Sequence, residues 1–277
     1  MTPDSDVPVL DLTRMRYEII PLKGIEDRLP HLPRGATVTV TSSPAKGMDA
    51  TLTLSETLAQ ARDDVAVVPH IAARLVRDRS HLSELVRRVS DLGVEDIFVV
   101  AGDASEPAGT FEGAAQLLRE LADIGHPFQR IGITGYPESH AFISDEETIR
   151  AMEEKLPFAS YICSQICDDA PTIARWVDDV RARGVTLPIY LGIPGVVDRT
   201  RLLRISMKVG LGDSIRYLRK QHGALSKFAS GYTPEDLVTG LKEAVMDPEK
   251  GVAGWHLFTF NEIEKTEAWR QEIAAEL

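Results

Sequence analysis

Short apolar runs rich in β-branched residues recur along the chain, and most are followed by a stretch with helical periodicity. Eight of these runs predict strands, at Met15–Ile20, Ala36–Thr41, Val65–Ile71, Asp96–Ala101, Arg130–Thr134, Ser160–Ile166, Leu187–Ile193 and Trp255–Phe260. Apolar residues three and four positions apart predict helices between them, for example at Ser80–Leu92, Phe111–Ile124 and Pro171–Arg183.

The spacing of the strands predicts how they are arranged. From Val65 to Ile193 a strand recurs about every 30 residues, the length of one strand, one helix and two short connections. Such a repeat without reversal favours a closed (β/α)8 TIM barrel over an open doubly wound sheet. We therefore predict an α/β fold in which residues 1–277 form a single barrel domain.

The last connection of the predicted barrel is about twice as long as the others. It runs from about residue 194 to residue 254, between strands seven and eight, and its pattern predicts a helical insertion with helices at Thr200–Gln221 and Pro234–Met246. The amphipathic segment Glu262–Leu277 predicts the eighth barrel helix.

Composition narrows the class of protein. With 43% hydrophobic and 26% charged residues, the chain has ample material for a core and is neither disordered nor a disulfide scaffold. The net charge of −11 argues against nucleic acid as a main partner. Cys163 and Cys167 are predicted to be buried free thiols, because nothing nearby supplies further metal ligands. The chain has no signal-like start and no apolar run of ~20 residues, so we expect a cytoplasmic protein that does not bind membranes.

Functional groups of a (β/α)8 barrel stand at the carboxyl ends of its strands. Polar candidates at those positions are Glu18, Ser43, His70, Asp103, Tyr136, His140 and Gln165. No set of histidines and carboxylates has the spacing of a metal site. No glycine-rich nucleotide loop follows the first strand, so any dinucleotide must bind at the barrel mouth.

Each candidate also has an ordinary structural interpretation. Glu18 could be a solvated edge residue, but a carboxylate inside a barrel is costly unless it is paired or used, which favours a functional role. Asp103 could cap the helix that follows it or shape the turn after Gly102. Gln165 would be a buried amide that needs partners, of which a polar ligand is one. His70 and His140 are more often packing residues than ligands.

Several segments together resemble a known family. YEIIPLKG, TSSPAKGMDATL, VVPHIAARLVRDRSHL, AGDASEPAGTFEGAAQLL, IGITGYPESH, YICSQICDD and GWHLFTFN resemble blocks of the methylenetetrahydrofolate reductases, in the same order, from Arg16 to Asn261. The resemblance implies a (β/α)8 barrel, in agreement with the strand spacing. It also implies reduction of 5,10-methylenetetrahydrofolate to 5-methyltetrahydrofolate by a reduced nicotinamide, NADH or NADPH, a reaction that feeds methionine synthesis.

The resemblance assigns roles to the candidate residues. Glu18 matches the family's catalytic glutamate and would be the general acid, which requires a raised pKa. Asp103 would hydrogen-bond the pterin and favour its cationic character. Gln165 and Tyr136 would contact the folate, and the cofactor-binding residues would be Ser43, His70, Tyr136 and His140.

Three departures from the family pattern concern the flavin that its bacterial members hold. Ala101 stands where they have an arginine near the flavin phosphates, the segment KLPFASYICSQ from Lys155 to Gln165 is one residue shorter and lacks their glycine, and GVVDRT from Gly195 has no aromatic residue. We therefore expect FAD to be absent or weakly bound, with hydride passing directly from the nicotinamide to the folate. A flavin-dependent reductase is the alternative.

Two other classes of function stay open. Lys46 could form a Schiff base in a lyase or aldolase, and the barrel could bind folate without catalysis, although a mere binder would not need Glu18. The basic stretch Arg199–Arg204, with Lys208, could receive the glutamate tail of folate or a pyrophosphate, but we interpret it as a solvated helix face.

Overall fold

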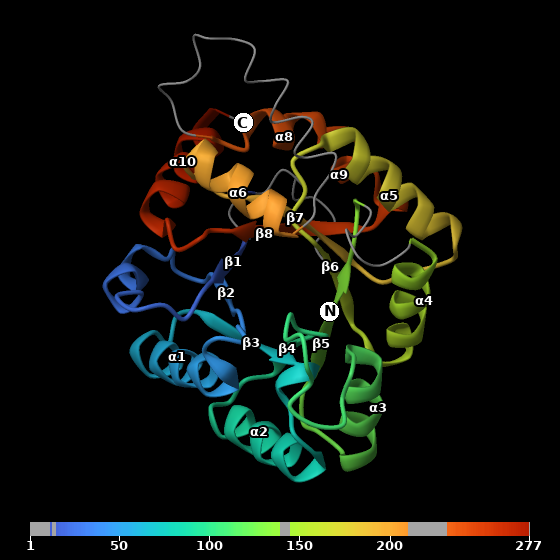
Figure 1. Cartoon of the computed structure of the whole chain (residues 1–277). Coiled ribbons are helices and arrows are strands. Elements are labelled where there is room, and N and C mark those ends of the chain that lie inside the picture. The colour runs from blue at the N-terminus through green and yellow to red at the C-terminus, as the bar shows by residue number, and fades with distance from the viewer. Residues whose placement is uncertain (1–11, 13–14, 139–144, 210–231, 277) are drawn as a thin grey trace, which may run out of the picture.

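Eight parallel strands form a closed barrel in a computed structural model of the chain, which describes residues 12, 15–138, 145–209 and 232–276. The strands follow one another in sequence order around the barrel, and β1 pairs with β8 to close it (Figure 1). Their bounds are β1 Arg16–Ile19, β2 Thr37–Val40, β3 Ala66–Ala72, β4 Asp96–Val100, β5 Arg130–Gly135, β6 Tyr161–Ser164, β7 Ile189–Pro194 and β8 Val252–Phe258. The predicted (β/α)8 TIM barrel is confirmed.

The helices form a ring outside the strands (Figure 1). They are α1 Gly47–Ala61, α2 Arg79–Asp91, α3 Ala114–Ile124, α4 Asp145–Lys155, α5 Ala170–Ala182, α6 Arg199–Val209, α8 Glu235–Gly240, α9 Lys242–Met246 and α10 Ile263–Glu276, with short 3-10 turns at Glu26–His31, Ala73–Leu75, Leu156–Phe158 and Pro248–Lys250. None of the described helices is both long and apolar enough to cross a membrane.

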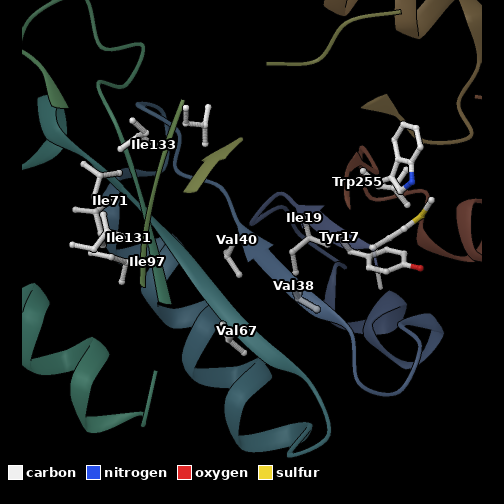
Figure 2. Packing of buried hydrophobic residues seen from close by; sticks show 14 of the residues in the cluster. Tyr17, Ile19, Val38, Val40, Val67, Ile71, Ile97, Ile131, Ile133 and Trp255 are labelled. Carbon is white, nitrogen blue, oxygen red and sulfur yellow. The ribbon is translucent and has the colours of Figure 1, made fainter. Parts of the chain in front are cut away.

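The main core lies between the strands and this ring of helices. Figure 2 shows Tyr17, Ile19, Val38, Val40 and Trp255 from β1, β2 and β8 packed among the buried hydrophobic residues of that layer. Side chains alternate between the two faces of a strand, so the outward Tyr17 and Ile19 leave their even-numbered neighbours facing the barrel interior. The interior face of β1 therefore carries two charged residues, Arg16 and Glu18.

Arg16 forms the floor of the barrel interior. Its guanidinium donates to the Tyr161 hydroxyl over 2.6 Å and to the Asp96 carboxylate over 3.3 Å. It also lies 4.5 Å from the ring centroid of Tyr161 and 4.9 Å from that of Tyr190. A buried charge needs such pairing, and this cluster fills the amino-terminal end of the barrel and leaves the carboxyl end for a site.

The connection between β7 and β8 is longer than the others and holds α6, α8 and α9 among its described residues. α6 corresponds to the first part of the predicted helix at Thr200–Gln221, and residues 210–231 lie outside the described residues. The predicted helix at Pro234–Met246 is two helices, α8 and α9, that meet at Leu241. Leu202 of α6 packs in one buried cluster with Phe260, and Phe258 at the end of β8 packs against that cluster.

Several predicted boundaries were wrong. β8 begins at Val252 and ends at Phe258, because Phe260 and Asn261 adopt left-handed φ angles of 50° and 64° that a strand cannot continue through. β6 ends at Ser164, so Gln165 follows the strand rather than lying within it. α3 begins at Ala114 after the cap residue Gly113, so the interpretation of Asp103 as its cap is wrong.

The expectation for the cysteines is confirmed. Cys163 and Cys167 are buried, and neither forms a disulfide bond. Among the described residues there is no group of three or more histidine, cysteine or carboxylate side chains that could hold a metal ion.

Candidate active site

A cavity of about 750 Å³ opens at the carboxyl ends of the strands. Strand ends from all round the barrel except that of β7 contribute to its lining, and α6 adds two arginines. Its lining includes Glu18, Thr41, Ser42, His70, Phe98, Asp103, Thr134, Gln165, Arg201, Arg204, His256, Phe258 and Phe260. The fold thus brings four of the predicted residues, Glu18, His70, Asp103 and Gln165, into one cavity.

Glu18 lies against two histidines in this cavity. Its Oε2 is 3.2 Å from Nε2 of His256 and 3.9 Å from Nε2 of His70. The side chain of Glu18 is 14% exposed, whereas those of His256 and His70 are 2% and 7% exposed. All three side chains line the cavity, and the carboxyl group of Glu18 belongs to the most exposed of them.

Burial sets the protonation states of the three groups. Burial raises the pKa of Glu18 to about 7, and the positive charge that His70 can carry lowers it only in part. Burial lowers the pKa of His70 to about 4, and burial with the nearby Arg16 charge lowers that of His256 to about 3. Near neutral pH both imidazoles are uncharged, while Glu18 exchanges a proton with its surroundings. A general acid needs this property.

The backbone of β1 is fixed by the turn that follows β8. The hydroxyl of Thr259 donates to the carbonyl of Glu18 over 2.6 Å. The amide side chain of Asn261 accepts from the backbone N–H of Ile20 at 2.8 Å and donates to its carbonyl at 2.9 Å. The left-handed backbone at Phe260 and Asn261 carries the chain through this turn, and strained conformations of this kind gather at functional sites. The turn holds Glu18 in register.

Asp103 stands exposed at the mouth, on the loop that follows β4. Arg74 anchors this loop by donating to the carbonyls of Ala104 and Ser105, at 2.6 and 2.7 Å. Gly102 has a φ of 90°, and a Cβ there would lie only 3.0 Å from the Cβ of Ala72. The sharp turn therefore requires glycine and directs the chain so that Asp103 lines the cavity.

Gln165 lines the cavity just beyond the end of β6. Its Oε1 accepts from the backbone N–H of Ile166 at 2.8 Å, and its backbone N–H donates to the Gly135 carbonyl at 2.7 Å. Among the described residues its side-chain amide nitrogen has no hydrogen-bond partner, so its N–H groups are free for a ligand.

Sequence reasoning missed the aromatic wall of the cavity. The GVVDRT stretch from Gly195 carries no aromatic residue, but Phe258 and Phe260 line the cavity from the end of β8 and the turn beyond it. Gly192 on β7 makes room for this wall, because a Cβ there would lie 2.8 Å from the Phe258 ring and 2.2 Å from the Ser164 carbonyl oxygen. The alternation of Trp255, His256, Leu257 and Phe258 was the available signal for inward His256 and Phe258.

The remaining predicted residues lie elsewhere or at the edge. Ser43 does not line the cavity, and its carbonyl instead accepts from the N–H of Gly47 at the start of α1. The Tyr136 phenol hydrogen-bonds the side chain of Thr134, which lines the cavity, while its ring belongs to a separate hollow between α4 and α5. His140 lies outside the described residues. Lys46 is exposed before α1 and does not line the cavity.

Lys155 has a structural place. Its ammonium donates to the hydroxyl and the carbonyl of Thr134, at 3.0 and 3.3 Å, and the residue is 5% exposed. Burial lowers its pKa to about 8. The lysine of the Lys155–Gln165 segment is therefore enclosed between α4 and β5, behind Thr134, and is not among the residues that line the cavity.

The chain resembles known proteins both in sequence and in structure. The profile of the family described as methylenetetrahydrofolate reductase matches residues 25–272. Methylenetetrahydrofolate reductase 1 of Schizosaccharomyces pombe is 30% identical over 116 residues, which cover 39% of this chain and 19% of the yeast protein. Methylenetetrahydrofolate reductase 2 of Saccharomyces cerevisiae is 24% identical over 136 residues, which cover 45% of this chain and 23% of that protein. The aligned part thus spans less than a quarter of these relatives.

Two solved structures share the fold at low sequence identity. One is an uncharacterized protein from Clostridium thermocellum that binds two copies of 5-methyl-5,6,7,8-tetrahydrofolic acid, with a TM-score of 0.62, 14% identity, and 95% and 96% of the two chains covered. The other is a GH18 chitinase from Cycas revoluta in complex with (GlcNAc)3, with a TM-score of 0.52, 13% identity, and 95% and 99% covered. Such likeness establishes the barrel alone. Because the family profile extends over most of the sequence, this chain belongs to the methylenetetrahydrofolate reductase family.

Proposed function

We propose that this barrel reduces 5,10-methylenetetrahydrofolate to 5-methyltetrahydrofolate, with NADH or NADPH as the hydride donor and without a tightly bound flavin. The observation that carries the proposal is the buried Glu18 carboxyl at the cavity surface, with a pKa raised to about 7 between two uncharged imidazoles. Family membership supplies the substrate class. The folate bound by the structural neighbour from Clostridium thermocellum fits a barrel of this kind.

The reaction needs a proton before it needs a hydride. The five-membered ring of the substrate opens when the bond between N10 and the methylene carbon breaks, which leaves an iminium at N5. Protonated Glu18 gives its proton to N10, directly or through one water, and is afterwards reprotonated from solvent. The reduced nicotinamide supplies the hydride that adds to the methylene carbon. One proton and one hydride together account for the product.

The other cavity residues orient the folate and favour its charge. The Asp103 carboxylate at the mouth hydrogen-bonds the pterin, and its negative charge stabilises the cationic iminium. The free amide N–H groups of Gln165 donate to the pterin edge. His70 and the aromatic wall of Phe258 and Phe260 provide the surface for the nicotinamide and the aromatic part of folate.

Two structural features support direct hydride transfer without tightly bound flavin. Ala101 offers no charge to flavin phosphates, and its carbonyl is occupied by the N–H of Arg74 at 2.9 Å. Lys155 is buried against Thr134 and is not available at the mouth. These residues do not fit the phosphate groups of FAD. An iminium carbon is electrophilic enough to accept hydride from a dihydronicotinamide directly.

The test begins with protein purified without added cofactor. We expect a colourless protein that oxidises NADH when methylenetetrahydrofolate is supplied, with steady-state kinetics that require a ternary complex of protein, folate and NADH. Stoichiometric flavin absorbance near 450 nm, turnover only after FAD is added, or ping-pong kinetics would contradict the flavin-free part of the proposal.

The rival functions make different demands on the cavity. A Schiff-base lyase needs a lysine in the cavity, and Lys46 lies outside it, so borohydride should trap no substrate adduct on this chain. A non-catalytic folate-binding barrel would show folate binding with no NADH oxidation.

A further inference from the structure

Helix α6 brings two arginines to the cavity. Arg201 and Arg204 are three positions apart on the helix and therefore share a face, and both belong to the cavity lining. The sequence pattern had favoured a solvated helix face for this basic stretch. The folded chain places part of that face over the site that holds Glu18.

The two arginines are used differently. Arg201 donates to the Glu262 carboxylate at 2.9 Å and to the Phe260 carbonyl at 3.0 Å, so it fixes α6 to the turn after β8. Arg204 is exposed to the cavity, and among the described residues it has no ion-pair or hydrogen-bond partner. Its guanidinium is therefore free to bind an anion.

The chemical groups along the cavity wall change in order from Gln165 to α6. Gln165 offers amide N–H groups, and the next residue, Ile166, packs in one buried cluster with Phe260 and with Leu202 of α6. Phe258 packs against this cluster and lines the cavity beside Ile166 and Phe260. The wall thus runs from an amide through apolar and aromatic side chains to the guanidinium of Arg204.

We propose that Arg204 binds a carboxylate of the glutamate tail of the folate, an inference that rests on the function proposed above. A folate has the same order of chemical groups as the wall: a hydrogen-bonding pterin, an aromatic p-aminobenzoyl ring and a dianionic glutamate. With the pterin beside Gln165 and Glu18, the glutamate lies toward α6. A guanidinium binds a carboxylate through two parallel hydrogen bonds, which suits this end of the ligand.

A dinucleotide pyrophosphate fits this wall less well. The pyrophosphate of NADH is flanked on both sides by riboses, whose hydroxyl groups need hydrogen-bond partners. The stretch that leads to Arg204 presents Ile166, Phe258 and Phe260, which offer none from their side chains. The apolar approach to the cation therefore favours the folate tail.

The experiment compares two folates on matched proteins. Calorimetry would measure the Kd of 5-methyltetrahydrofolate and of 5-methyltetrahydropteroate, which lacks the glutamate, for wild type and Arg204→Gln. We expect the substitution to raise the Kd of 5-methyltetrahydrofolate about tenfold, the size of one charge-assisted hydrogen bond, and to leave that of the pteroate and of NADH unchanged. Arg204→Lys should recover part of the loss. Arg87→Gln, which removes an exposed charge on α2, is the control and should change no Kd.

Other outcomes would overturn the assignment of Arg204. An equal loss for both folates would show that Arg204 acts on the structure of the site rather than on the glutamate. A raised Kd for NADH with unchanged folate binding would assign Arg204 to the pyrophosphate, and no change in any Kd would make α6 a solvated face. Failure of wild type to bind either folate would instead overturn the proposed function itself.

Discussion

Burial beside two neutral imidazoles raises the pKa of Glu18, which suits this residue to act as a general acid near neutral pH. With a pKa of about 7, its protonated form is present below pH 7 and is lost as the pH rises through that value. The pKa values of His70 and His256 are much lower, about 4 and about 3. Glu18 is therefore the one of these three groups that changes its charge near neutral pH. We predict that kcat falls by about tenfold per pH unit above pH 7. Steady-state rates from pH 6 to 9 check this, and a kcat that is flat to pH 9 would contradict it.

The same carboxyl has a cost in stability. Its folded-state pKa is raised above the ordinary 4.5, so its full contribution to stability is present below pH 4.5 and is lost as the pH rises through about 7. Glu18→Gln removes this loss of stability, because glutamine does not ionise. We predict that the variant gains roughly 1–3 kcal/mol of unfolding free energy relative to wild type on going from pH 5 to pH 8.

Urea denaturation at the two pH values measures this gain. Glu84→Gln, an exposed change on α2, is the matched control and should show no pH-dependent difference from wild type. A Glu18→Gln variant whose stability follows that of wild type at both pH values would show that Glu18 is not buried at a cost.

Single residues differ in how far the sequence could predict them. The functional role of Glu18 was predictable, because a carboxylate inside a β-branched strand is costly to bury unless it is paired or used. Arg16 was not, because its partners Asp96 and Tyr161 lie 80 and 145 positions away and only barrel closure brings them together. Strand alternation could have shown that His256 faces inward, but its role depends on Glu18, which only barrel closure brings beside it.

Among the elements, the turn after β8 controls the position of β1. Asn261 makes two side-chain hydrogen bonds to the backbone of Ile20 and holds a left-handed φ of 64°. We predict that Asn261→Ala loses about 2–4 kcal/mol of unfolding free energy, from the two lost hydrogen bonds and the strained backbone, and that kcat falls because Glu18 is no longer held.

A second substitution separates the two contributions. Asn261→Gly keeps the backbone free to adopt this φ but removes the amide, so it should lose less stability than Asn261→Ala while losing as much kcat. Thermal or urea unfolding and steady-state kinetics on both variants provide the readings. Unchanged kcat in both would contradict the role of this turn in positioning Glu18.

Element boundaries were less predictable than element types. The pattern gave the type and order of the strands, but β8 was displaced because the glycine at position 254 weakened its start and Phe260 resembled a strand residue at its end. Phe260 instead lies in a left-handed turn, which Arg201 of α6 holds by donating to the Phe260 carbonyl and which Asn261 ties to the backbone of Ile20. Local periodicity carries no information about such long-range contacts.

The whole barrel was predictable from strand spacing. Repeated strand–helix units that all run in the same direction commonly close into a (β/α)8 barrel. Its function was not predictable from the fold, which a chitinase shares. The ordered blocks from Arg16 to Asn261 indicated the family, and the profile match confirms it. The contents of the cavity, including Arg204 of α6, give this chain its individual features.

The route of the hydride is a property of the complete site. If it passes directly from nicotinamide to folate, deuterium at the transferred C4 position of NADH should appear in the methyl group of the product without dilution. A flavin intermediary holds that hydrogen on a nitrogen that exchanges with water. Mass spectrometry of the product made in ordinary water distinguishes the two routes, and loss of the label would contradict direct transfer.

The account depends most on the proton that Glu18 delivers. Its most direct test is NADH oxidation by wild type and Glu18→Gln at saturating methylenetetrahydrofolate, with the Kd of 5-methyltetrahydrofolate measured on both proteins. We predict that kcat falls by about 100-fold or more while this Kd changes less than about threefold. Equal kcat in the two proteins would contradict the account.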